Sequence, residues 1–315
     1  MEESKPGEFA VVLVNGTGSG EFAAVRDILR DSLETPVVLL EKAPVSYDMD
    51  SGLLDAGGRL VRPAVVWTRH TGALTLAVHT SLAPVAAAAW SSLATQLAAA
   101  APVALPGPAP RGTAQLLDAR RIGVPVPRTV LATDASAAVE RLRAARTVVK
   151  TPDFRLADAD RDNWGRYVPV VVDAAGPSAG DAPAHVVVVQ EYVGHVQELR
   201  VFHLDGGLCT FRVRKPGIAA PWTAPDTVSV TAVRCPAPAA DAVRRLCARW
   251  GLRYGAFDLL VRPDGEVVFL EANPDGDWLW YERRAGTPGR VSFMAAVMVR
   301  ALFARTAWKG ARDDD

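Results

Sequence analysis

The chain has 315 residues, of which 49% are hydrophobic, and its 35 basic residues balance its 35 acidic ones. This length and apolar content suffice for two or three small domains with cores of their own. The zero net charge argues against non-specific binding to nucleic acid or to an anionic membrane. The three cysteines, Cys209, Cys235 and Cys247, have neither the spacing of a zinc site nor that of a disulfide framework.

The first hundred residues predict a small α/β domain with a parallel sheet. Apolar runs at 9–16, 36–40 and 63–69 are typical of buried strands, and a helix is expected over 21–32. The glycine-rich turn 16–20 (GTGSG) lacks the G-x-G-x-x-G order of a dinucleotide-binding loop. The acidic start does not resemble a signal peptide, so we expect a cytoplasmic protein.

Residues 71–110 contain no Asp, Glu, Lys or Arg and include an alanine-rich run. Its prolines Pro84 and Pro102, the polar Gln96, and the use of alanine rather than leucine or isoleucine predict a packed helix and argue against a membrane span. The Pro/Gly-rich stretch 102–112 predicts a domain boundary.

Helices and strands continue beyond this boundary. Predicted helices lie at 113–122, 135–145, 239–250 and 291–305, and a strand over 146–151 carries Lys150. The polar segments 153–166 and 173–184 predict loops, and 197–215 a hairpin that turns at 205–207. We therefore expect four parts, which are a first domain (1–105), a linker helix with a small subdomain (106–193), a larger subdomain (194–308) and a tail (309–315).

A second hairpin, over residues 255–273, turns at the sequence PDG. If Arg262 pairs with Val267, Asp258 lies opposite Glu271, about 5 Å away on the same face. Asn273 follows two residues later and stays on that face if the strand continues. The sequence thus predicts that two carboxylates and an amide converge.

Two facing carboxylates repel each other unless a cation lies between them. Oxygen ligands without histidine or cysteine suit Mg²⁺, so Asp258, Glu271 and Asn273 predict a magnesium site. The alternative is that the two acids only end their strands and pair with Arg253 or Arg262.

At this point the sequence resembles a known family. GLRYGAFDLLVRPDGEVVFLEANPDGDW (251–278) is similar to the metal-binding hairpin of ATP-grasp ligases, above all to ribosomal-protein glutamate ligases and to graspetide (microviridin-type) peptide maturases. VVVVQEYVGHVQELRVFHLDG (186–206) resembles their nucleotide hinge and acid–x–Arg strand, and RTVVK (146–150) the strand of their nucleotide lysine. The resemblance implies an α/β (α+β) ATP-grasp fold, with residues 1–105 as a pre-ATP-grasp domain.

The resemblance also implies that ATP and Mg²⁺ are bound, and it assigns the nucleotide contacts. Lys150 would contact the α- and β-phosphates, and Glu198 would lie near the nucleotide. The hinge, whose backbone would read the adenine edge, would consist of Gln190, Glu191, Tyr192 and Val193. The alternative for Lys150 is a lysine that merely ends a strand.

The residues nearest the chemistry follow from the same resemblance. Arg200 would hold the transferred phosphoryl group or the acyl-phosphate, and Arg214 and Lys215 would form a basic pair facing the phosphates. The hairpin residues Asp258, Glu271 and Asn273 would hold two Mg²⁺ ions. Alternatively, Arg200 and Arg214 face solvent on alternate strand positions.

Such enzymes join a carboxylate to an amine or hydroxyl through an acyl-phosphate. The first hypothesis is therefore a ligase that macrocyclises or otherwise modifies a ribosomal precursor peptide. The alternatives are a ligase for amino acids or small peptides in a natural-product pathway, and a non-catalytic nucleotide-binding module. A homodimer is expected only by analogy.

Two departures from the family pattern stand out. The segment 153–166 has one glycine, where relatives carry a glycine-rich loop that closes over the phosphates. A second nucleotide lysine is expected near the linker helix, where the nearest cation is Arg111.

Overall fold

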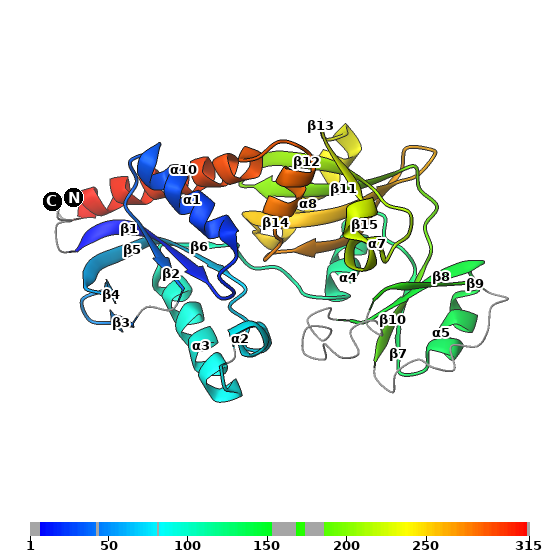
Figure 1. The fold of residues 1–315 in the computed structure, drawn as a ribbon, viewed down its shortest axis with the longest axis horizontal. Helices are drawn as coiled ribbons and strands as arrows, with labels where there is room; N and C mark the ends of the chain where they lie inside the picture. Colours follow the sequence, from blue (N-terminus) through cyan, green and yellow to red (C-terminus); the bar gives the residue numbers. More distant parts are fainter. Residues whose placement is uncertain (1–6, 42–43, 81, 153–167, 174–185, 314–315) are drawn as a thin grey trace.

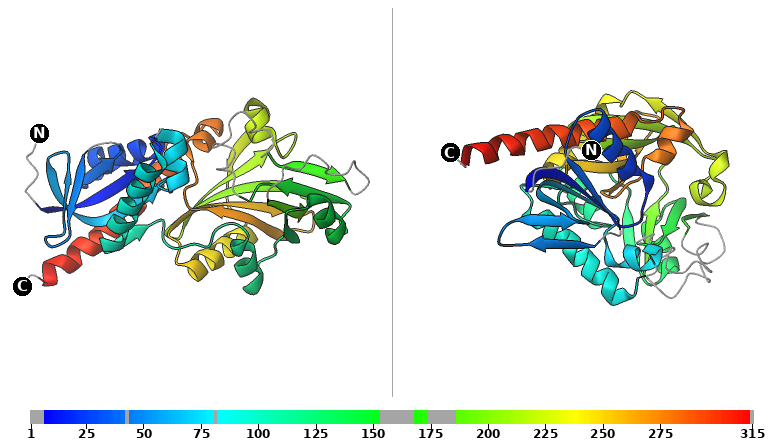
Figure 2. Two further views of the ribbon diagram at one scale, coloured as in Figure 1. Left: turned by 90° about the horizontal axis from the view of Figure 1, so that it is seen from below. Right: turned by 60° about the vertical axis from the view of Figure 1, so that its left-hand side comes forward.

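The structure, a computed structural model, describes residues 7–41, 44–80, 82–152, 168–173 and 186–313, with side chains to residue 306. Within these residues the chain forms three β-sheets. Sheet A belongs to the N-terminal domain, sheet B forms a small unit at the opposite end of the molecule, and sheet C lies between them (Figures 1 and 2).

Sheet A has the order β2-β1-β5-β4-β3, and β6 also pairs with β5. Its central strands β1, β2 and β5 are parallel, as the sequence predicts, whereas β3 and β4 form an antiparallel extension that the sequence does not reveal. The strands are β1 (Glu8–Asn15), β2 (Val37–Leu40), β3 (Val45–Asp48), β4 (Leu53–Ala56), β5 (Arg59–Arg69) and β6 (Val103–Leu105).

The predicted alanine-rich helix forms as two helices, α2 (Ala73–Thr80) and α3 (Pro84–Ala100). Alanine has the highest helix propensity, and Pro84 occupies the first turn, where proline is tolerated. Ala94 and Leu97 of α3 pack on one face of sheet A, and α1 (Gly20–Asp31) covers the other face. Within the described part of the chain, no helix is long and apolar enough to cross a membrane.

Sheet B has the antiparallel order β7-β10-β8-β9, formed by β7 (Thr129–Ala132), β8 (Arg146–Lys150), β9 (Val170–Asp173) and β10 (Val187–Glu191). Helix α5 (Ala135–Leu142), whose N-terminus is capped by Asp134, packs on one face of this sheet. The other face carries Lys150, because Lys150 pairs with Val188, one residue out of phase with the α5-facing Val189. The predicted loop at 153–166 lies outside the described residues, and so does the predicted loop at 173–184 except for Asp173, which ends β9.

Sheet C has the antiparallel order β13-β12-β11-β14-β15. Its strands are β11 (Gln197–Leu204), β12 (Gly207–Arg214), β13 (Ser229–Val233), β14 (Tyr254–Val261) and β15 (Val267–Asn273). Both predicted hairpins are confirmed as β11–β12 and β14–β15. The back face of the sheet packs on α8 (Ala237–Trp250) and on α4 (Ala114–Arg121), so α4 belongs with sheet C and not with sheet B, where the sequence grouped it.

One hydrophobic core joins sheet A to the front face of sheet C. It contains Leu13 and Trp67 from sheet A, Phe202 and Tyr254 from sheet C, and Val299 of α10 (Arg290–Asp313) between them. Helix α10 runs past both sheets (Figure 1) and stays helical through Asp313, where the sequence predicted a tail from 309. The short elements α7 (Ala220–Thr223), η2 (Pro225–Thr227) and α9 (Leu279–Arg284) lie in the connections around sheet C.

Glu282 of α9 has a side chain that caps α10. The residue is 1% exposed, and its carboxylate accepts the backbone N–H groups of Gly289 and Ser292 at 3.1 and 2.9 Å, and also that of Val291. These N–H groups lie at the start of α10, where they have no partner within the helix. The positive end of the helix dipole lies there as well, which favours a negative charge.

We predict that Glu282→Ala lowers the free energy of unfolding by about 3 kcal/mol, because it leaves buried donors without partners. Glu282→Gln keeps one acceptor oxygen and should cost about half as much. The measurement is urea unfolding followed by tryptophan fluorescence. The control, Glu266→Ala, removes only the exposed ion pair with Arg262 and should cost less than about 0.5 kcal/mol. Equal losses in Glu282→Ala and the control would contradict the capping role.

Candidate functional site

The front face of sheet C is apolar at one end and polar at the other. Phe202 and Tyr254 lie at the apolar end, within the core shared with sheet A. Further along the same strands, side chains on that face are charged, and they come from Glu198, Arg200, Asp258, Glu271 and, by strand alternation, Asn273. The polar end borders sheet B, because Lys150 Nζ of β8 lies 4.0 Å from Glu271 Oε2.

The two predicted acids face each other, but by a different register from the one predicted. Val261, and not Arg262, pairs with Val267, and the strands stay in that register to Leu259 and Phe269. A β-bulge then shifts the pairing by one residue and brings Asp258 opposite Glu271.

This bulge decides which face the second acid occupies. Without it, Asp258 would pair with Leu270, and Glu271 would share the back face with Phe269, which is buried against α8. Bulges are frequent beside functional sites because they redirect a side chain in this way.

Arg200 pairs with Asp258 on the neighbouring strand. Its Nη1 donates to both carboxylate oxygens, at 3.0 and 2.9 Å, and only 9% of its side chain is exposed. Its guanidinium also lies 5.3 Å from the ring centre of Tyr281. Burial alone would lower the pKa of Arg200, but the charge of Asp258 outweighs it and raises the pKa, so the guanidinium is permanently charged. Its Nε–H is buried and has no hydrogen-bond partner among the residues that the structure describes.

Glu271 lies between Asp258, which carries the same charge, and Lys150, which carries the opposite charge. Desolvation by the surrounding protein and the charge of Asp258 raise the pKa of Glu271, and Lys150 offsets this only in part. About half of the side chain, 54%, nevertheless remains exposed to solvent. Asp258 and Glu271 therefore form a strained pair of acids that a cation would relieve.

Asn273 and the edge of β15 are held from two sides. The Oδ1 of Asn273 accepts the backbone N–H of Asp275 at 2.9 Å, which orients the amide and leaves a lone pair free. On the outer edge of β15, the buried Gln115 of α4 donates to the carbonyl of Ala272 at 2.7 Å and accepts its N–H at 2.9 Å. Helix α4 thus fixes the backbone between Glu271 and Asn273.

The predicted basic pair at the end of β12 is split. Lys215 Nζ lies 2.7 Å from Glu198 Oε1, so both residues belong to the polar end of the front face. Arg214 is exposed and points to the other face, because Val213 beside it faces the front opposite Glu198. The structure therefore brings Lys215 to the site and leaves Arg214 away from it.

The predicted hinge follows β10. Gln190 is 4% exposed and donates to the hydroxyl of Thr129 at 3.0 Å. Glu191 is held by Arg128 at 2.7 Å, which points its carboxylate toward β7, and its backbone N–H donates to the carbonyl of Arg128 at 3.0 Å. The ring of Tyr192 stacks on Arg146 at 4.1 Å. The carbonyl of Val193 accepts from the ring of His195 at 2.9 Å if His195 Nδ1 carries the proton.

Arg69 of β5 is a contributor that the sequence reasoning missed. Its side chain is fully buried, and its Nη2 donates to the carbonyls of Asp275 and Gly276, at 2.9 and 3.1 Å, and to Asp277 Oδ1 at 2.7 Å. Its guanidinium also lies 4.6 Å from the ring centre of Trp278. The N-terminal domain thereby holds the loop that directly follows Asn273.

His70, which directly follows β5, holds the same loop, and we call the contacts of Arg69 and His70 with residues 275–277 the Arg69 clamp. Its Nε2 lies 3.0 Å from Asp277 Oδ1, and its backbone N–H donates to Asp275 Oδ1 at 3.3 Å. Burial alone would raise the pKa of Asp277, but the hydrogen bond to His70 and the charge of Arg69 lower it to about 2.

Gly276 and Tyr281 bring this loop against Arg200. A Cβ at Gly276 would lie 2.4 Å from the Cβ of Ala256 and 2.9 Å from Arg200 Nη2, so only glycine fits. Burial raises the pKa of Tyr281, which packs on Arg200, to about 12. Gly276 lies within the run 251–278 quoted above for its likeness to ATP-grasp ligases, and Tyr281 follows shortly after that run ends.

The donors fit a hard divalent cation. Asp258, Glu271 and Asn273 offer only oxygen ligands, and the repulsion between the two acids is the kind that such an ion removes. Among the described residues, no group of three or more His, Cys, Asp or Glu side chains could hold a metal ion. The remaining ligands would have to come from Asn273, from water or from a substrate.

We predict that Glu271→Gln stabilises the protein in the absence of ligand. Because the pKa of Glu271 is raised in the folded state, the free energy of unfolding falls as the pH rises above the ordinary glutamate value, and glutamine escapes this loss. The gain should stay below about 1 kcal/mol, since the side chain is half-exposed, and should vanish at lower pH. Thermal unfolding at several pH values measures it, with Glu266→Gln as the control. A loss of stability at neutral pH would contradict the strained pair.

No model of a protein family matches the sequence, and no curated protein matches it. Solved structures do match the fold. The ATP-grasp ligase PsnB, solved with a variant of its minimal precursor, Mg and ADP, is 19% identical, with 94% of this chain and 99% of that chain covered at a TM-score of 0.70. The macrocyclase MdnC from Microcystis aeruginosa, bound with the precursor peptide MdnA, is 17% identical, with 92% and 99% covered and a TM-score of 0.67.

An enzyme with a small product has the same architecture. D-alanyl-alanine synthetase A from Vibrio cholerae is 15% identical, with 96% of this chain and 100% of that chain covered at a TM-score of 0.57. At these identities the likeness establishes architecture and not activity. The chain has the fold of the ATP-grasp ligases.

Proposed function

We propose that this protein is an ATP-dependent ligase that joins a carboxylate to an amine or hydroxyl through an acyl-phosphate. The observation that carries the proposal is the row Arg200–Asp258–Glu271 across sheet C, with Lys150 reaching it from sheet B. Phosphoryl transfer needs charge neutralisation and positioning more than covalent help from the protein. This row supplies both, with two acids for cations and two cations for phosphoryl oxygens.

Each residue has a distinct part in the proposed site. Arg200 is a permanently charged, planar donor, suited to an acyl-phosphate, and Asp258 fixes its orientation. Lys150 acts as a point charge toward the nucleotide phosphates. Glu198 positions Lys215, whose side chain is 17% exposed and lies on the same side of sheet C.

We propose that Asp258, Glu271 and Asn273 hold Mg²⁺. When bound, the metal would neutralise phosphate charge. The hinge from Gln190 to Val193 would bind adenine through its backbone carbonyls and the N–H of Val193, because the N–H groups of Glu191 and Tyr192 already donate to the carbonyls of Arg128 and Arg146. The N-terminal domain, sheet B and sheet C would then act as pre-ATP-grasp domain, lid and catalytic subdomain.

The proposed substrate is a ribosomal precursor peptide, which is macrocyclised or otherwise modified. The support is that PsnB and MdnC were solved with precursor peptides and match over nearly the whole of both chains. The second candidate is a ligase for amino acids or small peptides, favoured by the equally complete match to D-alanyl-alanine synthetase. A homodimer and a cytoplasmic location stay predictions from the sequence.

The experiment that tests the function combines ADP release with mass spectrometry. The protein is incubated with Mg²⁺ and ATP, and with either free amino acids or synthetic peptides rich in Asp, Glu, Lys and Thr. We expect peptide-dependent ADP release and a product lighter by one water for each bond formed. Release with free amino acids alone would favour the small-molecule ligase. ATP binding without ADP release in any mixture would contradict both.

The row Arg200–Asp258–Glu271, with Lys150 beside it, also predicts which substitutions lower ADP release. Glu271→Gln and Lys150→Met should each lower ADP release at least about 100-fold, because the first removes a charged ligand of the proposed metal and the second removes a positive charge that acts on the phosphates. Both side chains are partly exposed, so the folded state should survive, which circular dichroism checks. Glu266→Gln and Arg214→Met are the matched controls, since the structure places both residues away from the row. A variant of Glu271 or Lys150 with near-normal rates would contradict the assignment.

A further inference from the structure

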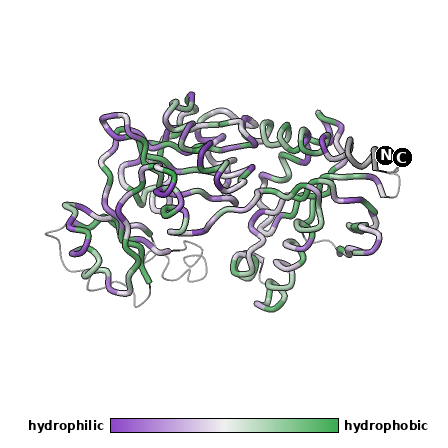
Figure 3. Tube along the Cα trace, turned by 180° about the vertical axis from the view of Figure 1, so that it is seen from behind, coloured by the Kyte–Doolittle hydropathy of each residue, from purple (hydrophilic) through white to green (hydrophobic). Residues whose placement is uncertain are grey.

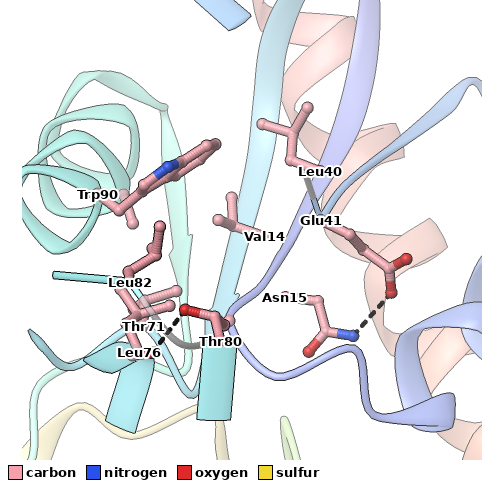
Figure 4. Close-up of a pocket in the computed structure, with 11 residues that line it drawn as sticks. Val14, Asn15, Leu40, Glu41, Thr71, Leu76, Thr80, Leu82 and Trp90 are labelled. Atoms are coloured by element: carbon pink, nitrogen blue, oxygen red, sulfur yellow. Dashed lines mark hydrogen bonds between the residues drawn. The ribbon is translucent and has the colours of Figure 1, made fainter. Parts of the chain in front are cut away.

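The N-terminal domain contains a pocket that the proposed ligase site does not use. It has a volume of about 260 Å³ and opens at the carboxyl ends of β1 and β2, beside α2 and α3. In Figure 4, Trp90, Leu82 and Leu76 lie on one side of the pocket, and Leu40 and Glu41 lie on the other. Crevices outside the carboxyl ends of parallel strands are common binding sites.

Among the described residues that line the pocket, Glu41 is the one charged residue, and its side chain is held in place. Glu41 is exposed, and its Oε1 accepts the side-chain N–H of Asn15 at 3.1 Å (Figure 4). Asn15 is 3% exposed and also donates to the carbonyl of Ser19 at 2.9 Å. A buried amide thus fixes a carboxylate at the rim of an apolar pocket, and, of the lining residues that the structure describes, none has a basic side chain that neutralises it.

The surroundings favour an apolar ligand with a positive charge. Helices α2 and α3 contain no Asp, Glu, Lys or Arg, and Figure 3 draws them mostly in hydrophobic and neutral colours. The volume lies below the range of about 300–1,000 Å³ typical of whole small-molecule ligands, and it suits a single large side chain.

The pocket is joined to the loop that follows Asn273. Thr71 lines the pocket and directly follows Arg69 and His70, which hold residues 275–277. Gly16 lines it as well and packs so closely on the carbonyl of His70 that a Cβ there would overlap it. In Figure 1, α2 lies on the side of the N-terminal domain that is nearer to sheet B.

We propose that this pocket binds the peptide substrate by one leucine-sized or aromatic side chain and that Glu41 pairs with a lysine or arginine next to it in the peptide. The identification of this peptide as the substrate rests on the proposed function. The pocket itself is defined by the packing and the charge described above. Because Arg69 and His70 connect the pocket to the loop beside Arg200, a peptide anchored here is presented by the same element that shapes the ligase site.

Binding is measured by fluorescence anisotropy with a fluorescein-labelled glycine–serine peptide that carries a central Leu-Lys. Two companion peptides carry Leu-Glu and Gly-Lys in its place. The full chain should bind Leu-Lys tightest, with Leu-Glu about fivefold weaker and Gly-Lys about tenfold weaker. Equal affinity for the three peptides, or no binding of Leu-Lys, would overturn the proposal.

Variants locate the binding. Trp90→Ala should weaken Leu-Lys binding about tenfold and Trp90→Phe should restore most of it, whereas Val85→Ala, exposed on the same helix and outside the pocket, should change nothing. Glu41→Lys should reverse the preference between Leu-Lys and Leu-Glu, and Asp50→Lys, an exposed charge elsewhere on the domain, should not. Equal effects of the pocket and control variants would refute this location.

The two proposals fail separately. If the peptides bind with the expected pattern but the protein releases no ADP under any condition, the pocket stands and the ligase function falls. If products form with unchanged KM for peptide in Trp90→Ala and Glu41→Lys, the ligase function stands and the pocket falls.

Discussion

The repulsion between Asp258 and Glu271 is the constraint around which the structure is built. Their like charges lie on neighbouring strands, and desolvation by the surrounding protein, together with the charge of Asp258, raises the pKa of Glu271 although its side chain is half-exposed. Arg200 and Lys150 offset part of the cost, one from the same sheet and one from sheet B. The rest is offset by apolar packing on both faces of sheet C, which provides a rigid frame for a charge cluster that would not hold together by itself.

Strand β15 lies at the edge of its sheet, where strands are the least constrained. Three features fix it: the bulge that turns Glu271 to the front, the amide of Gln115 that satisfies Ala272, and the Arg69 clamp on the loop after Asn273. The last two come from segments far away in the sequence, α4 and β5. The N-terminal domain is therefore part of the site's support, which its shared core with sheet C also indicates.

The sequence predicted what local pattern determines. Alternation and turn residues located both hairpins, and Asp258 faces Glu271 as predicted, although the bulge and not the predicted register brings them together. The bulge was not predicted, because one extra residue in β15 leaves a hydrophobic pattern that is compatible with either register of the β14–β15 hairpin. The roles of Arg69, Gln115 and Gly276 escaped because each depends on long-range contacts, and Arg214 was misplaced because a basic pair on adjacent strand positions must divide between two faces.

The central claim is that the facing acids hold Mg²⁺ against a nucleotide, and isothermal titration calorimetry of ATP tests it most directly. The account predicts that the wild-type protein binds ATP with Mg²⁺ present and much more weakly with a chelator. It also predicts that Glu271→Gln loses this dependence on the metal while the protein stays folded. Equal binding with and without Mg²⁺, or unchanged binding in Glu271→Gln, would contradict the account.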